Sequence, residues 1–217
     1  KRLTEPLGVD GLVIGADDES FSRLADQMGT PSIRDYSTIR KRYKVPQFAP
    51  AGQIRRLFSR GLTPRQLLNY FGDPEFYRAS IPAVNGMFDA RSLAKLYAML
   101  SNWGEFEGHQ FLTPEVIGKA REVQTRRFDR VAIYPLHWRL GYHRADAVIR
   151  NYPNAFGHYG FGGAGGWANP EEGLAFGLVH NSSPFTLLGH IRCIAITGAV
   201  YEGAKIANLN QKRALTA

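Results

Sequence analysis

The chain has 217 residues, of which 44% are apolar and 21% are charged. This composition is typical of a globular domain with a buried core and excludes a disordered chain, so we predict one domain over residues 1–217. No uninterrupted apolar run reaches 18 residues, and we therefore expect no membrane span. A single cysteine, Cys193, excludes a disulfide scaffold and a cysteine-based zinc site.

The net charge of +8 comes from one segment, residues 31–66. This segment holds nine basic residues against one acid, and elsewhere 18 basic residues balance 18 acidic ones. It shows no sustained helical or strand period, so we predict an irregular segment. A nucleic-acid surface is one interpretation of such a patch. Because the segment matches no nucleic-acid module, we favour a solvated loop or a face for an acidic partner and expect no nucleic-acid ligand.

Short elements are predicted in the first half of the chain. Residues 9–15 favour a strand, and residues 17–28 have the period of a helix. Thr63-Pro64 and Thr113-Pro114 each place a capping hydroxyl before a proline, which marks two helix N-termini. Four apolar residues after Asp89 recur at i, i+3, i+4 and i+7 and predict a helix with a core face: Leu93, Leu96, Tyr97 and Leu100.

Residues 126–206 predict sheet strands and a closing helix. Strands are expected at 130–134, 137–143, 156–168 and 174–181, with a turn at 169–173 that makes the last two a hairpin. A helix is expected from about 183 to 203. Its predicted inward residues are Leu187, Leu188, Ile191, Ile194, Ala195 and Gly198 or Ala199. Helices followed by consecutive strands and one helix predict an α+β fold, an antiparallel sheet flanked by helices.

Gly160, Gly162 and Gly165 satisfy the dinucleotide fingerprint G-x-G-x-x-G. That site requires a helix to begin at the glycines and an acid about twenty residues later. Here a turn and another predicted strand follow instead, and no acid occurs between Glu172 and Glu202. We therefore reject a nucleotide site and expect no cofactor and no metal.

Two further motifs imitate those of penicillin-binding proteins and serine β-lactamases. Ser92-Leu93-Ala94-Lys95 matches S-x-x-K, in which a lysine assists a nucleophilic serine. The apolar stripe of the same helix places Lys95 in solvent and Ser92 on the flank. Tyr152-Pro153-Asn154 matches Y-x-N, but it precedes the next motif so closely that we predict a turn entering a strand. An enzyme that uses Ser92, Lys95, Tyr152 and His158 is the interpretation we favour least.

A longer stretch carries a resemblance over nearly the whole chain. Residues 156–163 read F-G-H-Y-G-F-G-G, followed by the N-P-E turn at 169–171 and the G-L-A-F strand at 173–176. In this order the sequence resembles the β-lactamase-like serine hydrolases with the penicillin-binding-protein fold, especially the esterase branch related to class C β-lactamases. Upstream stretches are similar to the same family: residues 5–9, 81–86, 103–105 and 111–115.

The resemblance implies a site on the strand that carries H-x-G, which takes the place of K-T-G in this family. His158 and the backbone N–H of Phe161, as oxyanion donor, are the implied catalytic groups. Tyr159, Gly160 and Gly162 are the implied substrate-binding residues, because glycines let a substrate approach the backbone. A histidine is mostly neutral near pH 7, which favours plain esters over carboxylate-bearing β-lactams. The alternative is an ordinary strand histidine beside glycines that relieve crowding.

In that family the S-x-x-K helix and the Y-x-N loop precede the P-L-G stretch, here Pro6-Leu7-Gly8. The resemblance thus implies the C-terminal portion of a larger hydrolase, incomplete without a preceding N-terminal polypeptide and inactive alone. The complete protein would act on carboxylic esters, or on amides or β-lactams. The alternative is a non-catalytic scaffold or assembly protein. A homo-oligomer stays open. The compartment is unknown, with the cytoplasm slightly favoured, and any signal peptide would lie outside this chain.

Overall fold

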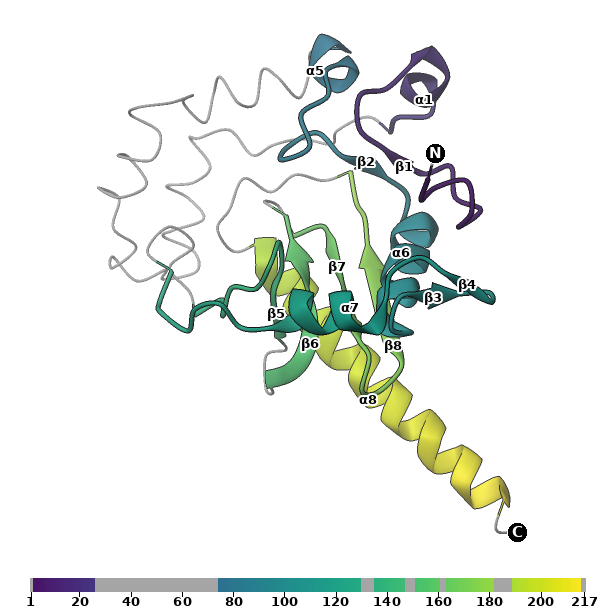
Figure 1. Cartoon of the computed structure of the whole chain (residues 1–217), viewed down its shortest axis with the longest axis vertical. Helices are drawn as coiled ribbons and strands as arrows, with labels where there is room; N and C mark the ends of the chain where they lie inside the picture. The colour runs from purple at the N-terminus through teal and green to yellow at the C-terminus, as the bar shows by residue number, and fades with distance from the viewer. Residues whose placement is uncertain are drawn as a thin grey trace, which may run out of the picture.

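A computed structural model describes residues 2–25, 74–129, 135–146, 151–160, 163–181 and 189–215 (Figure 1). The basic segment 31–66, the helix predicted after Thr63 and the strand predicted at 130–134 lie outside the described residues. The described part combines helices with an antiparallel sheet, as the sequence predicts.

Four antiparallel strands form the main sheet in the order β5-β6-β7-β8. Their bounds are β5, His143–Asp146; β6, Asn151–Tyr159; β7, Gly165–Asn169; and β8, Leu174–Leu178. The predicted turn at 169–173 is confirmed between β7 and β8, where Gly173 adopts a φ of +63°. The strand predicted at 156–168 was wrong as a single element: it comprises the end of β6, a turn, and β7.

The strand predicted at 137–143 is not formed. Only Trp138 makes a bridge, to Thr125, and the chain then turns back through a hydrogen bond from the Arg139 N–H to the Tyr142 carbonyl. Gly141 in this turn has a φ of +78°, a conformation that glycine adopts without strain. Because the chain turns at this glycine, strand β5 begins only at His143.

Helices cover both faces of this sheet (Figure 1). Helices α6 (Ala90–Ser101) and α7 (Pro114–Arg121) share one core cluster with Phe156 and Ala168 of the sheet. Helix α8 (Gly189–Leu215) closes the other face, where Trp167 belongs to a second cluster. Figure 1 shows the second half of α8 running past the sheet toward the C-terminus.

The helix starts predicted after Asp89 and at Thr113 are confirmed. Asp89 caps α6, accepting the Ser92 N–H at 2.8 Å, and Thr113 caps α7 with Pro114 in its first turn. The predicted core stripe of α6 is also confirmed: Leu93, Tyr97 and Leu100 are buried, and Leu96 packs against them.

The remaining elements are short. Strand β1 (Leu12–Val13) pairs with β2 (Met87–Phe88), and β3 (Glu105–Phe106) pairs with β4 (His109–Gln110). Helices α1 (Asp18–Ser22) and α5 (Pro74–Arg78) have five residues each.

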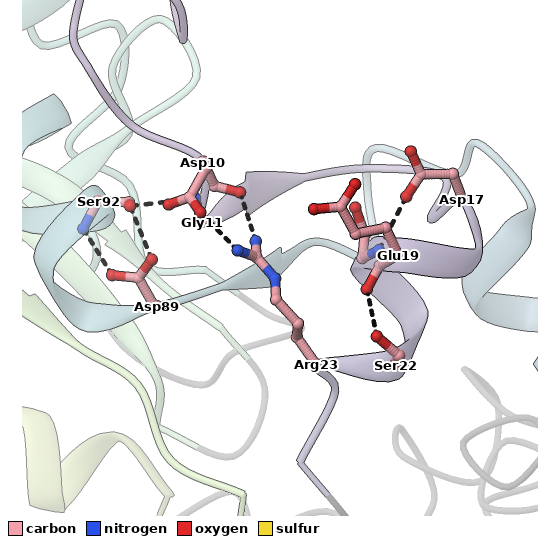
Figure 2. Close-up of polar contacts among 9 residues, drawn as sticks. Asp10, Gly11, Asp17, Glu19, Ser22, Arg23, Asp89 and Ser92 are labelled. Atoms are coloured by element: carbon pink, nitrogen blue, oxygen red, sulfur yellow. Dashed lines mark hydrogen bonds and ion pairs between the residues drawn. The ribbon is translucent and has the colours of Figure 1, made fainter.

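Helix α1 is shorter than the helix predicted over 17–28. It begins where Asp17 accepts the Ser20 N–H at 2.8 Å, and it ends at Ser22. Arg23 folds back onto Asp10, bonding both its carboxylate and its carbonyl oxygen (Figure 2). This tertiary contact limits the helix in spite of its apolar period.

The inward face of α8 agrees with the prediction at Ile194, which packs against the second cluster, and differs from it at the alanines. Cys193, Thr197 and Tyr201 are buried, whereas Ala195 and Ala199 are exposed. The Thr197 hydroxyl accepts the Trp167 Nε1–H at 2.9 Å and lies 3.3 Å from the Tyr159 hydroxyl. Because these buried polar groups need partners, a threonine faces the sheet where a purely apolar criterion favours alanine. The predicted positions Leu187 and Leu188 lie outside the described residues.

Glycines let α6 approach β7 and β8 closely. A Cβ on Gly166 would lie 2.4 Å from the Tyr97 ring and 2.6 Å from the Phe176 carbonyl oxygen. A Cβ on Gly177 would lie 2.9 Å from the Ala94 nitrogen and 3.0 Å from the Ala90 carbonyl oxygen. Both contacts include backbone atoms, which cannot move aside without shifting the helix or the strand.

We expect Gly166→Ala to lower the free energy of unfolding by about 1–3 kcal/mol, because the added methyl overpacks this contact. Urea unfolding followed by circular dichroism measures the change. The matched control is Gly118→Ala in α7, where a Cβ meets nothing within 4 Å and helix propensity favours alanine. Equal stability of the Gly166→Ala variant and the parent protein would contradict this account of the packing.

Candidate functional site

His158 lies near the end of β6, on the face of the sheet that α6 covers. It pairs with Gly166 of β7, and paired residues of antiparallel strands project to the same face. That face is identified by Tyr97 of α6, whose ring a Cβ on Gly166 would strike. The His158 side chain is exposed, so the sequence places a titratable group where a ligand has access.

Two aromatic rings flank the His158 imidazole. The ring centroid of His143 lies 5.3 Å away, and that of Trp138 lies 6.4 Å away. Solvent reaches the imidazole, but the protein atoms around it displace part of its hydration shell, and this desolvation of the cation lowers the pKa of His158 below its usual range. At neutral pH the group is therefore an uncharged imidazole, able to donate one hydrogen bond and accept another.

Trp138 lies in the segment before β5, and two contacts hold its ring in place. Its Nε1–H donates to Asp129 Oδ2 at 2.6 Å, and its ring meets His143 edge-on at 5.7 Å. Neither Trp138 nor His143 was among the predicted site residues. The signal that could have found them is the concentration of aromatic side chains in the H-W-R-L-G-Y-H stretch, residues 137–143, where Trp138 is the second residue and His143 the last.

Tyr159 contacts this neighbourhood through its backbone N–H and through one edge-on ring contact with His143, centroids 5.0 Å apart. Its side chain points into the α8 cluster, where the hydroxyl contacts Thr197. Its N–H donates to His143 Nε2 at 2.9 Å. The structure therefore does not bring the predicted substrate-binding side chain of Tyr159 to the His158 face.

The glycines of the motif divide into two groups. A Cβ on Gly165 would lie 2.2 Å from the His158 carbonyl oxygen, and one on Gly157 would lie 2.0 Å from the Gly166 carbonyl oxygen. These positions serve strand packing. Among the described residues, a Cβ on Gly160 meets one atom within 4 Å, the Ala164 oxygen at 3.4 Å, and this part of the structure leaves the backbone there open to approach. The predicted residues Phe161 and Gly162 lie outside the described residues.

Gly160 belongs to the turn between β6 and β7. Its N–H donates to the Ala164 carbonyl at 2.7 Å, and its own carbonyl accepts the Gly163 N–H at 3.0 Å. The chain then enters strand β7 at Gly165. The glycines thus form a turn that leads into a strand, which is not the strand-to-helix geometry that a dinucleotide fingerprint requires.

Ser92 is engaged in structure. It is 4% exposed, and its hydroxyl donates to Asp89 Oδ2 at 2.7 Å and accepts the Gly11 N–H at 3.2 Å (Figure 2). Lys95 donates to the Gly8 carbonyl at 3.4 Å and lies over the Phe106 ring. Ser92 is thus buried and not on a flank, and Lys95 is half-buried and not in solvent. The reason is that the N-terminal segment and β3 cover the side of α6 that the helical period predicts to be exposed to solvent.

The Tyr152-Pro153-Asn154 stretch, predicted to be a turn that enters a strand, instead lies within β6, which begins at Asn151. The register against β5 shifts between Arg144 and Asp146, and Tyr152 faces α8, stacked on Tyr201 with ring centroids 3.4 Å apart. The buried Arg139 guanidinium donates to the carbonyls of Pro153 and Ala155 at this irregularity. Tyr152 therefore lies on the face opposite His158.

Within the described ranges, no three His, Cys, Asp or Glu side chains gather in a way that could hold a metal ion. None of the helices in the described part of the chain combines the length and the apolarity needed to cross a membrane.

Comparisons with known proteins agree on one family. The family model described as "Beta-lactamase" matches residues 1–194. The "Esterase/beta-lactamase LipL" of Mycobacterium tuberculosis (strain ATCC 25618 / H37Rv) is 32% identical over 208 residues, which cover 94% of this chain and 47% of that protein. The chain thus spans about half the length of this relative.

Two solved structures share the fold. A novel penicillin-binding protein homologue from Caulobacter crescentus superposes with a TM-score of 0.63 at 27% identity, over 91% of this chain and 50% of that chain. A family VIII carboxylesterase superposes with a TM-score of 0.65 at 22% identity, over 89% of this chain and 49% of that chain. The latter likeness concerns the fold alone.

The lowered pKa of His158 predicts a pH-dependent stability. Between its folded pKa and the ordinary value near 6.5, the unfolded chain binds the proton more readily, so stability falls as pH drops through this window. His158→Gln should make the fall shallower, measured by urea unfolding at a series of pH values. His109→Gln, at an exposed strand position, is the control. An unchanged pH profile in His158→Gln would contradict the prediction.

Proposed function

Because this chain belongs to the beta-lactamase family, we propose that it is the C-terminal part of an esterase-type serine hydrolase. In this proposal it supplies the H-x-G strand and the oxyanion side of the site, and the nucleophilic serine comes from a preceding part of the same protein. The chain's span of about half its relatives' length supports this division. The substrate class is a carboxylic ester, with amides and β-lactams as the competing classes.

The observation that carries the proposal is the position of His158. It stands exposed at the end of β6, next to the open backbone of Gly160, with aromatic rings at its sides. Its lowered pKa keeps it neutral near pH 7. A neutral group attracts a substrate carboxylate less than a lysine would, so this site favours uncharged esters.

The proposed ester hydrolysis has two steps, acylation of a serine and hydrolysis of the acyl-enzyme. A serine hydroxyl adds to the ester carbonyl, its proton passes to the departing alcohol, and an acyl-serine ester remains. Water then adds to that ester, which releases the carboxylic acid and restores the hydroxyl. In both steps a negative charge develops on the carbonyl oxygen, where the N–H of Phe161 is the proposed donor. His158 would orient the carbonyl or leaving-group side of the substrate.

Within the described residues, the only S-x-x-K sequence does not supply this serine. The Ser92 hydroxyl already bonds Asp89 and Gly11, and Lys95 bonds the Gly8 carbonyl. A nucleophile needs a hydroxyl that is exposed and next to its base. These contacts support a structural role for both residues.

We expect the 217-residue chain alone to form no acyl-enzyme. Incubated with a fluorophosphonate probe, it should show no stoichiometric labelling by intact-protein mass spectrometry, because it holds no activated serine. Full-length protein treated in parallel should label once, at a serine outside these residues. Labelling of Ser92 would overturn the proposal. Absence of labelling in the full-length protein as well would favour a non-catalytic scaffold.

In the full-length protein, His158→Ala should lower ester turnover by about 10²–10³, the usual cost of losing one such group. The fold should survive, because the side chain is exposed. His158→Lys should improve acceptance of carboxylate-bearing esters relative to neutral ones. Steady-state kinetics on a matched pair of esters measures both effects.

The controls for this experiment are Lys95→Ala and Tyr152→Phe, which the proposal leaves outside the site. Both should keep ester turnover within a few-fold of the parent. Full activity in His158→Ala, or loss of its fold, would show that the histidine is structural and would reject this assignment.

A further inference from the structure

The last residue of β6, Tyr159, pairs with Gly165 of β7 on one side, and on its other side it lies beyond the first residue of β5. β5 begins at His143, which pairs with Gly157, so the antiparallel register places Tyr159 opposite Gly141. Gly141 lies in the turn before β5 and has a φ of +78°. The Tyr159 N–H therefore points past the end of β5, where a buried donor must find another acceptor.

The side chain of His143 provides that acceptor. Its Nε2 accepts the Tyr159 N–H at 2.9 Å, and its Nδ1 lies 2.8 Å from the Arg144 carbonyl oxygen. Because Nε2 accepts a hydrogen bond, Nδ1 carries the ring hydrogen and donates it to that carbonyl. Both ring nitrogens are thus satisfied only in one neutral tautomer, in a side chain that is 2% exposed.

We propose that His143 is a positioning residue for the H-x-G strand: its imidazole extends the β5–β6 pairing by one hydrogen bond and fixes the backbone between His158 and Gly160. The expected effect of His143 on catalysis rests on the proposed function, whereas its effect on the backbone does not. The proposal assigns no contact between His143 and substrate. The groups proposed to contact the substrate remain His158 and the N–H of Phe161.

The packing of the rings supports this role. His143 contacts His158 and Trp138, with centroids 5.3 and 5.7 Å away, and meets the Tyr159 ring edge-on at 5.0 Å. One side chain therefore touches the residues on both sides of the peptide bond that joins His158 to Tyr159. Without the imidazole, the strand end would lose its lateral hydrogen bond and the ring that flanks His158.

Three variants separate the hydrogen bond from simple packing. His143→Gln places an amide oxygen near the position of Nε2 and keeps an acceptor for the Tyr159 N–H. His143→Asn reaches only the position of Nδ1 and loses that acceptor, and His143→Leu loses both bonds. His109→Gln is the surface control. The Gln and Asn pair keeps the test decisive if the Leu variant fails to fold.

The readouts in full-length protein are hydrogen exchange of the Tyr159 amide, the titration of His158 by NMR, and the separate values of kcat and KM. In His143→Asn we expect at least tenfold faster exchange and a His158 pKa that rises toward its usual value as hydration improves. We expect kcat lower by roughly 10- to 100-fold with KM little changed, the cost of a misplaced group. His143→Gln should restore all three.

A folded His143→Asn variant with parental exchange, titration and kcat would overturn the proposal. Equal losses in the Gln and Asn variants would also overturn it, because the acceptor would then be irrelevant. If the parent protein shows no esterase activity while exchange and titration respond as expected, the proposed function fails and the positioning of the strand end by His143 is supported.

Discussion

The direct contact between α6 and the strands β7 and β8 is the constraint on which the rest of this structure depends. It requires residues without side chains at Gly166 and Gly177, where a Cβ would strike the helix or the neighbouring strand. Helix α6 thus covers one face of the sheet directly. On the opposite face, the Trp167 cluster packs against α8. The paired position on β6, His158, is thereby left at the edge of the α6 layer, where solvent reaches it.

Much of this arrangement follows from local sequence rules. The caps at Asp89 and Thr113 and the apolar stripe after Asp89 are short-range patterns, and each forms the helix it predicts. The turn at 169–173 is likewise encoded by its own residues. The H-x-G stretch could be found from sequence only through the family resemblance, because one histidine among glycines has no distinctive period.

The remaining features depend on contacts between distant segments. The buried face of α8 is decided by hydrogen bonds from Trp167 and Tyr159 to Thr197, which a count of apolar residues cannot reveal. The half-burial of Lys95 depends on an N-terminal segment more than eighty residues away. The place of His143 beside Tyr159 depends on where β5 begins, and that is set by the turn at Gly141.

The crowded glycines also affect how related sequences can be compared. Gly157, Gly165 and Gly166 tolerate no side chain for reasons of packing alone, so they would stay unchanged in a relative that had lost all activity. Their retention in an alignment would consequently carry no information about catalysis. Gly160 is different, because its surroundings leave room for a methyl group. Under the proposed function, variation at Gly160 among relatives would be expected to follow ligand preference, whereas variation at the other three would require the strand packing to change.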